Sequence, residues 1–181
     1  MKGVVFTEFV ELVEDKFSFD MADQVIEACD LESGGAYTSL GTYDHNELLQ
    51  MVTHLSDFAG APVPDLVRTF GLHLAERFAE QFPDFFADKD LFEFLESVDG
   101  YIHVEVRKLY ADAELPSFTA ERVGDDALVM KYSSTRPFSE LAHGLILGTI
   151  EQFGEPADVT IEDTSPASDP GTAATFTIKK K

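Results

Sequence analysis

The chain has 181 residues, of which 44% are hydrophobic, enough for one ordinary domain with a buried core. Its formal net charge is -21 at pH 7 and its pI is near 4.3. We expect no binding to nucleic acid or to anionic membranes, because contacts with phosphate need clustered Lys and Arg. Solubility is the simple reason for such a charge, and a basic patch on a protein partner is the alternative.

The single cysteine, Cys29, excludes an intramolecular disulfide and favours a reducing compartment. The N-terminus lacks the apolar run of a signal peptide, and every apolar run is far shorter than the ~20 residues that span a bilayer. We therefore expect a soluble protein of the cytoplasm.

The first part of the chain has helical periodicity. Five helices are expected, over residues of about 2–18, 21–30, 45–58, 64–82 and 90–109. Asp44 with Glu47 resembles a capping box for the third helix. Pro64 suits the first turn of the fourth helix, and Pro83 closes it. Gly100 lies inside the fifth helix and weakens it locally.

The pattern changes after Leu115-Pro116. Strands are expected over 117–123 and 127–134, joined by a hairpin, followed by a helix over about 138–153 that stops at Gly154. Alternation around 159–161 and 174–178 predicts two more strands, with a loop over 165–171 between them. The fold class is therefore α+β, with a helical N-terminal part and a C-terminal antiparallel sheet with an inserted helix. One domain over 1–181 is expected, with a helical subdomain of about 1–62 and an α+β part of about 63–181.

Residues 132–136, YSSTR, alternate like a strand. Because residues two apart in a strand share a face, Tyr132, Ser134 and Arg136 would point the same way and form a clamp for an anion. His103 lies about thirty residues upstream on a helical pattern. A soft-metal ligand before a carboxylate clamp suggests haem, with the imidazole on the iron and the propionates in the clamp. A core histidine and an ordinary edge strand are the alternative reading.

Five histidines are candidates for an axial ligand: His45, His54, His73, His103 and His143. The first three suit caps or helix surfaces. His143, beside Gly144 on the helix after the clamp, is the main competitor of His103.

Several stretches, in this order, resemble the H-NOX family, the haem-nitric oxide/oxygen binding proteins that include the haem domain of soluble guanylate cyclase. They are MKGVVFTEFVELVEDKF, GGAYTSLGTYDHNELL, DLVRTFGLHLAERFAEQFPDFF, YIHVEVRKLY, and KYSSTR followed by a helix. The resemblance covers essentially the whole chain. It implies that haem b is enclosed between the helical part and the sheet, that His103 binds the iron, and that Tyr132, Ser134 and Arg136 hold the propionates. It also implies that Pro116 packs against the porphyrin.

The resemblance assigns two further helices to the distal side of the haem. Each carries an apolar pair four residues apart, and by pattern alone these are core residues. With two residues of the first helix, the expected distal wall is Val5, Phe9, Leu74, Phe78, Leu141 and Leu145. Oxygen-binding members of the family carry a Tyr at the position of Leu141. An apolar wall implies binding of NO and CO with discrimination against O₂, because bound O₂ draws negative charge and gains from a hydrogen-bond donor, whereas Fe(II)-NO is far less polar.

The resemblance thus implies a sensor of nitric oxide that signals when the bond between iron and His103 breaks and its helix and the haem relax. No effector domain is present, so the output would be a separate protein, such as a histidine kinase or a cyclic-di-GMP synthase or phosphodiesterase. An enzyme is not expected, because the sequence has no G-x-S-x-G, H-E-x-x-H or P-loop motif. An O₂-binding haem protein and a haem-free acidic interaction domain are the alternatives.

Overall fold

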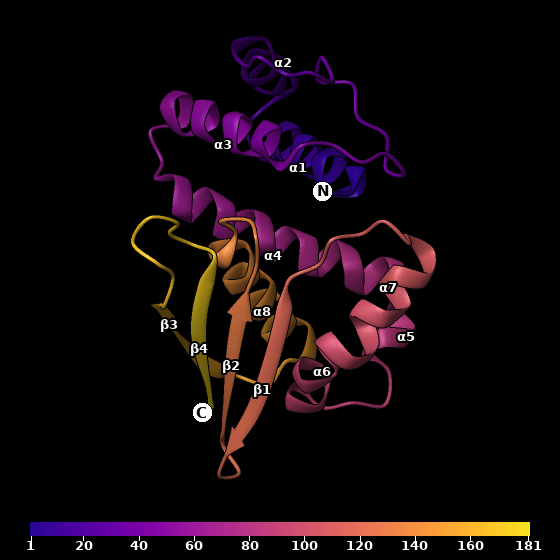
Figure 1. Cartoon of the computed structure of the whole chain (residues 1–181), viewed down its shortest axis with the longest axis vertical. Coiled ribbons are helices and arrows are strands. Elements are labelled where there is room, and N and C mark those ends of the chain that lie inside the picture. Colours follow the sequence, from indigo (N-terminus) through magenta and orange to yellow (C-terminus); the bar gives the residue numbers. More distant parts are fainter. The chain divides into compact units, whose positions relative to one another are not determined.

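The computed structural model describes all residues, 1–181, and divides into two compact units, Met1–Phe70 and Gly71–Lys181 (Figure 1). The predicted α+β class is confirmed: helices fill the N-terminal part, and a four-stranded antiparallel sheet lies in the second unit. The division falls inside helix α4, Val63–Gln81, a few residues after the boundary that the sequence suggested. That both units act as one haem-binding domain stays a prediction.

The first unit contains α1 (Gly3–Lys16), α2 (Phe19–Ala28), α3 (His45–Ala59) and the first part of α4. Local signals set the helix ends. Ser18 caps α2 by accepting a hydrogen bond from Met21 N, and Gly60, in the left-handed conformation, ends α3. The core of the unit is aromatic and aliphatic: Phe6, Phe9, Leu12, Val13, Leu48, Met51, Leu55 and Phe70.

The predicted capping box of Asp44 and Glu47 is wrong. Asp44 caps α3, but it accepts its hydrogen bond from Asn46 N, at 3.0 Å. Glu47 turns inward and is only 5% exposed. Its carboxylate accepts from the backbone N and the hydroxyl of Ser33, at 3.2 and 2.5 Å, and from the Tyr37 hydroxyl, at 2.8 Å. The Glu47 carboxylate is buried, so it must be fully hydrogen-bonded. The donors of the loop can do this in the interior, whereas the end of the helix is exposed to water.

Four short helical segments open the second unit after α4. They are α5 (Pro83–Phe86), α6 (Leu91–Ser97), the π-helical turn η1 (Val98–Ile102) and α7 (His103–Leu109). Pro83 both closes α4 and opens α5. The single helix that we predicted over 90–109 is therefore interrupted, and Gly100 lies in the π turn that interrupts it. Such π turns are uncommon and often occur at functional sites.

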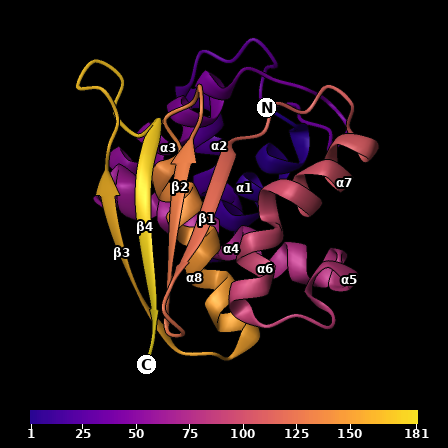
Figure 2. The same cartoon turned by 60° about the horizontal axis from the view of Figure 1, so that its bottom comes forward.

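The sheet consists of β1 (Ser117–Val123), β2 (Ala127–Ser133), β4 (Ala173–Lys180) and β3 (Ala157–Asp163), in this spatial order. Helix α8 (Ser139–Phe153) connects β2 to β3, as predicted, and lies with α6 on one face of the sheet (Figure 2). The inner face of the two central strands is buried and apolar. It is formed by Leu128, Met130, Tyr132, Ala174, Phe176 and Ile178.

No helix of the chain is both long enough and apolar enough to cross a membrane.

Substitution of Glu47 by Ala tests its role in the first unit. The change would remove the carboxylate acceptor of the Ser33 and Tyr37 donors in a part-buried place, so we expect a loss of about 3 kcal/mol in the free energy of unfolding. Urea titration measures it. Glu11→Ala, which removes an exposed carboxylate on α1, is the control and should change little. Equal midpoints for the two variants would contradict the prediction.

Candidate functional site

His103 is the first residue of α7 and directly follows the π turn. It is 8% exposed, and its ring lies 5.9 Å from the ring of Phe118 on β1. Its Nδ1 is buried and makes no hydrogen bond, although Asp99 Oδ1 approaches it to 3.5 Å. The same Asp99 oxygen accepts a hydrogen bond from Phe118 N, at 3.1 Å. One carboxylate thus links the π turn, the imidazole and the first strand.

The surroundings of His103 favour its neutral form. Burial lowers the pKa of the imidazole below its ordinary value, and the positive charge of Arg107 acts in the same direction. The Asp99 carboxylate opposes them but does not reverse the shift. A neutral imidazole with a carboxylate beside its second nitrogen is the form in which histidine binds metals.

Tyr132 lies on the buried face of β2 and is 4% exposed. Its ring lies 5.4 Å from that of Phe118, so the rings of His103, Phe118 and Tyr132 form a continuous aromatic row. Burial raises the pKa of the Tyr132 phenol above its ordinary value, so the hydroxyl remains a hydrogen-bond donor. The structure therefore brings the predicted ligand and the first clamp residue together through Phe118, which the sequence did not single out.

The predicted strand face shared by Tyr132, Ser134 and Arg136 is wrong. The strand ends at Ser133, and Ser134 and Arg136 lie in a turn beyond it. Ser134 Oγ accepts a hydrogen bond from Arg136 N at 3.1 Å, and the Tyr132 hydroxyl reaches the Arg136 carbonyl oxygen at 3.5 Å. A serine hydroxyl competes with strand pairing in this way, because it offers the backbone a local partner. The first two residues thus hold the backbone of the third.

The guanidinium of Arg136 is directed at Glu114. Nη1 donates to the Glu114 carbonyl oxygen at 2.9 Å, and Nη2 donates to the Glu114 carboxylate. The Arg136 side chain is only 13% exposed. Pro116, two residues after Glu114, is half-buried. The turn therefore presents a mostly shielded guanidinium that is arranged to hold a carboxylate.

The helices with the predicted distal residues of this unit, α4 and α8, cross in direct contact. A Cβ atom on Gly71 would lie 2.4 Å from the Leu141 carbonyl oxygen and 2.8 Å from Leu145 N. Leu74 is buried, whereas Phe78, Leu141 and Leu145 are half-buried. Val5 and Phe9 belong to the other unit, where Phe9 packs against Phe70 with ring centroids 5.2 Å apart. That these six residues line one wall stays a prediction.

The other histidines have other surroundings. His143 is 9% exposed, and its Nδ1 lies 3.3 Å from Glu140 Oε2. His45 lies beside Asp44, and His54 lies near the ring of Phe58. No three His, Cys, Asp or Glu side chains are grouped so as to hold a bare metal ion.

Sequence reasoning missed Asp99, Glu114 and Phe118. Asp99 left a usable signal, because it precedes His103 by four residues and such pairs share a helix face. Glu114 and Phe118 left none, because their partners Arg136 and Asp99 lie 22 and 19 residues away in the sequence.

Comparison with known families identifies this arrangement. The family described as HNOB, Haem-NO-binding, matches residues 2–161. The chain belongs to the H-NOX family. H-NOX domains are haem-based gas sensors, and their haem iron is the cofactor of the family.

Solved H-NOX structures share the fold over the whole chain. A variant of the K. algicida H-NOX in the Fe(II) unliganded state is 41% identical, with a TM-score of 0.93, over 100% of this chain and 97% of that one. The H-NOX from Shewanella woodyi, bound to IWP-051 in the Fe(II)CO state, is 45% identical, with a TM-score of 0.80, over 100% and 95%. The S. oneidensis H-NOX in the Fe(II)NO state is 22% identical, with a TM-score of 0.86, over 100% and 99%, and shows the fold alone. A comparison with curated proteins gives no match.

The residues of this H-NOX chain fit a haem. His103 offers a buried imidazole in its neutral form, with Asp99 beside the second ring nitrogen. Arg136 offers a shielded guanidinium that already holds a carboxylate group, the chemical type of a propionate. Tyr132 and Ser134 fix that arginine through its backbone.

Substitution of Gly71 by Ala tests the close crossing of α4 and α8. The added methyl group would meet backbone atoms of α8, which cannot rotate away, so we expect a loss of about 1–3 kcal/mol in the free energy of unfolding. Gly100→Ala is the control, because nothing lies within 4 Å of a Cβ there and Ala favours helix over Gly. Urea titration followed by circular dichroism compares the two. A Gly71 variant as stable as the parent would show that α8 can shift without cost.

Proposed function

We propose that this H-NOX chain binds haem b and senses nitric oxide, with His103 as the axial ligand of the iron. Ferrous haem supplies the metal to which the gas binds. The observation that carries the proposal is the buried imidazole of His103, in one aromatic row with Tyr132 at the start of the Y-x-S-x-R signature. The family, described as Haem-NO-binding, and the Fe(II)CO state of the S. woodyi member support the choice of gas.

The propionates would be held at the turn after β2. Arg136 would bind one carboxylate with its planar fork, and Tyr132 and Ser134 would orient it through the backbone bonds described above. Pro116 would pack against the porphyrin, since its rigid ring can hold a contact without losing rotamer freedom. Asp99 would act as a positioning residue, because its carboxylate lies beside Nδ1 of the imidazole and would leave Nε2 to hold the iron.

Selectivity for NO would come from the lack of a hydrogen-bond donor on the distal side. The expected wall offers only hydrocarbon and aromatic groups: Val5, Phe9, Leu74, Phe78, Leu141 and Leu145. A polar ligand gains more than an apolar one from a donor, so such a wall favours NO and CO over O₂.

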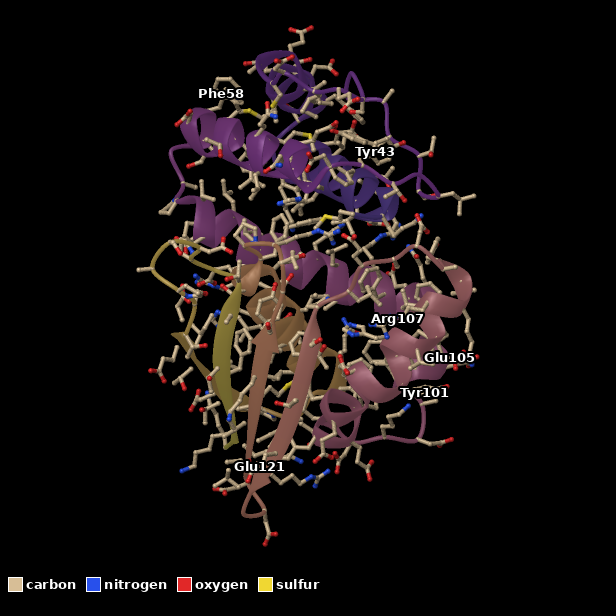
Figure 3. The ribbon with its side chains drawn as sticks, in the orientation of Figure 1. Tyr43, Phe58, Tyr101, Glu105, Arg107 and Glu121 are labelled. Atoms are coloured by element: carbon tan, nitrogen blue, oxygen red, sulfur yellow. The ribbon has the colours of Figure 1, made fainter.

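The signal would leave through the helical segment that carries His103. Once the imidazole is free, η1 and α7 would be held by the Asp99 bond to Phe118 and by packing of residues such as Leu95 and Ile102. Tyr101, 44% exposed, and Glu105, which pairs with Lys108, lie on the outer side of this segment (Figure 3). A partner could read a shift of the segment there.

The chain would act without catalysis of its own, on a separate effector. A histidine kinase or a cyclic-di-GMP synthase or phosphodiesterase is the proposed partner, in the cytoplasm. The lack of catalysis and the class of the partner rest on the resemblance to the family.

Substitution of His103 by Ala tests the axial ligand. The purified variant should lose the Soret absorption of bound haem, and free imidazole should restore it, because the small ligand replaces the missing side chain. His143→Ala, at the other buried histidine, is the matched control and should keep its haem. The assignment is wrong if the His143 variant loses haem and the His103 variant keeps it.

Exposure of the ferrous protein to air tests the distal side. We expect no stable oxygenated spectrum, because no distal side chain donates a hydrogen bond, and we expect normal spectra with NO and CO. Leu141→Tyr places a hydroxyl at the position of the family's distal tyrosine and should raise the affinity for O₂. A stable oxygenated form of the unmodified protein would refute NO selectivity while leaving haem binding intact.

A further inference from the structure

Arg136 is paired inside the chain with a carboxylate of the protein itself. The Glu114 carboxylate accepts from Nη2 and the Glu114 carbonyl oxygen accepts from Nη1, at 2.9 Å. The two partners differ in exposure, since the Arg136 side chain is 13% exposed and that of Glu114 is 76% exposed. The arginine is therefore fixed and shielded, whereas the carboxylate itself can turn to water, provided that another anion takes its place on the guanidinium.

Glu114 occupies a connecting position in the chain. It lies between the end of α7, the helix that begins with His103, and Pro116, the residue before β1. The bond from its carbonyl oxygen ties this connection to the turn after β2, and any residue type at this position would keep it, because the acceptor is a main-chain atom. The carboxylate adds a second bond that depends on the residue type.

Two carboxylates cannot share this guanidinium without cost. One positive charge would then face two negative charges in a largely shielded place, and like charges at such distances repel each other. The pair with Glu114 also uses one of the two Nη groups that a planar fork offers to a carboxylate. A propionate that binds Arg136 would therefore displace the Glu114 carboxylate.

We propose that Glu114 is an internal competitor of the haem propionate for Arg136. The inference rests on the proposed function of Arg136. Without haem, the Glu114 carboxylate neutralises the shielded guanidinium. When haem is bound, this carboxylate turns to solvent, while the carbonyl oxygen of Glu114 keeps its bond to Nη1. Glu114 thereby weakens haem binding and couples haem loading to the connection between α7 and β1.

Haem loss from the ferric, haem-loaded protein tests the competition. The rate is measured by transfer to excess apomyoglobin. Glu114→Gln removes the charge, keeps the size, and should slow haem loss by up to about fivefold, which corresponds to the ~1 kcal/mol of a surface ion pair. Glu105→Gln is the matched control, because Glu105 is a carboxylate of α7 that pairs with Lys108, and its haem loss should not change.

A second measurement separates competition from a structural role. The thermal midpoint of the haem-loaded Glu114→Gln protein should equal that of the parent, because the carboxylate is already released in that state. A lower midpoint with faster haem loss would show that Glu114 positions Arg136, and would overturn the proposal. Unchanged haem loss in the Glu114 variant would overturn it too.

The Arg136→Ala variant distinguishes a failure of the competition from a failure of the proposed propionate site. It should lose haem faster than Arg68→Ala, whose arginine pairs with Asp65 in the other unit. Equal rates in these two variants would reject Arg136 as a propionate ligand. A fast Arg136 variant together with an unchanged Glu114 variant would reject the competition alone.

Discussion

The hydrogen bond between Asp99 and Phe118 fixes the segment on which the candidate site depends. It joins the π turn to the first strand, at 3.1 Å, and the same carboxylate lies beside the imidazole of His103. The turn is otherwise held by packing of Val98 and Ile102 and by its own backbone hydrogen bonds. Because the Phe118 ring also lies between the rings of His103 and Tyr132, tilted against both, one residue of β1 receives both the polar and the aromatic contacts of the site.

Electrostatics divides the site into a neutral and a charged part. Around His103, burial removes the proton that would block metal binding, and the pKa of the imidazole is lowered accordingly. Around Arg136, the guanidinium keeps its charge and needs an anion, because a shielded cation without a partner is costly. In the structure that anion comes from Glu114. A haem has the same two needs, an iron that takes a neutral ligand and a propionate that takes a cation.

The strong negative charge of the chain leaves few cations that could bind a propionate. Few cations are present, and several of them already have partners: Arg122 pairs with Glu96, Lys180 with Glu155, and Arg136 with Glu114. In a chain with 13 Lys and Arg against 34 Asp and Glu, any added carboxylate competes with carboxylates of the protein itself. On the proposed function, a propionate would therefore bind Arg136 by displacing the carboxylate of Glu114.

The sequence by itself determined the α+β class, most helix boundaries, the family, and the candidates His103 and Arg136. These follow from periodicity, from Gly and Pro at helix ends, and from a short motif, all of which act over a few residues. The tertiary structure decided the partners, such as Ser33 and Tyr37 for Glu47, and Glu114 for Arg136. It also ended β2 at Ser133, before Ser134 and Arg136, and placed a π turn directly before His103. Hydrophobic spacing shows which face of an element is buried, but a polar side chain takes the donor that the fold brings to it, however distant in the sequence.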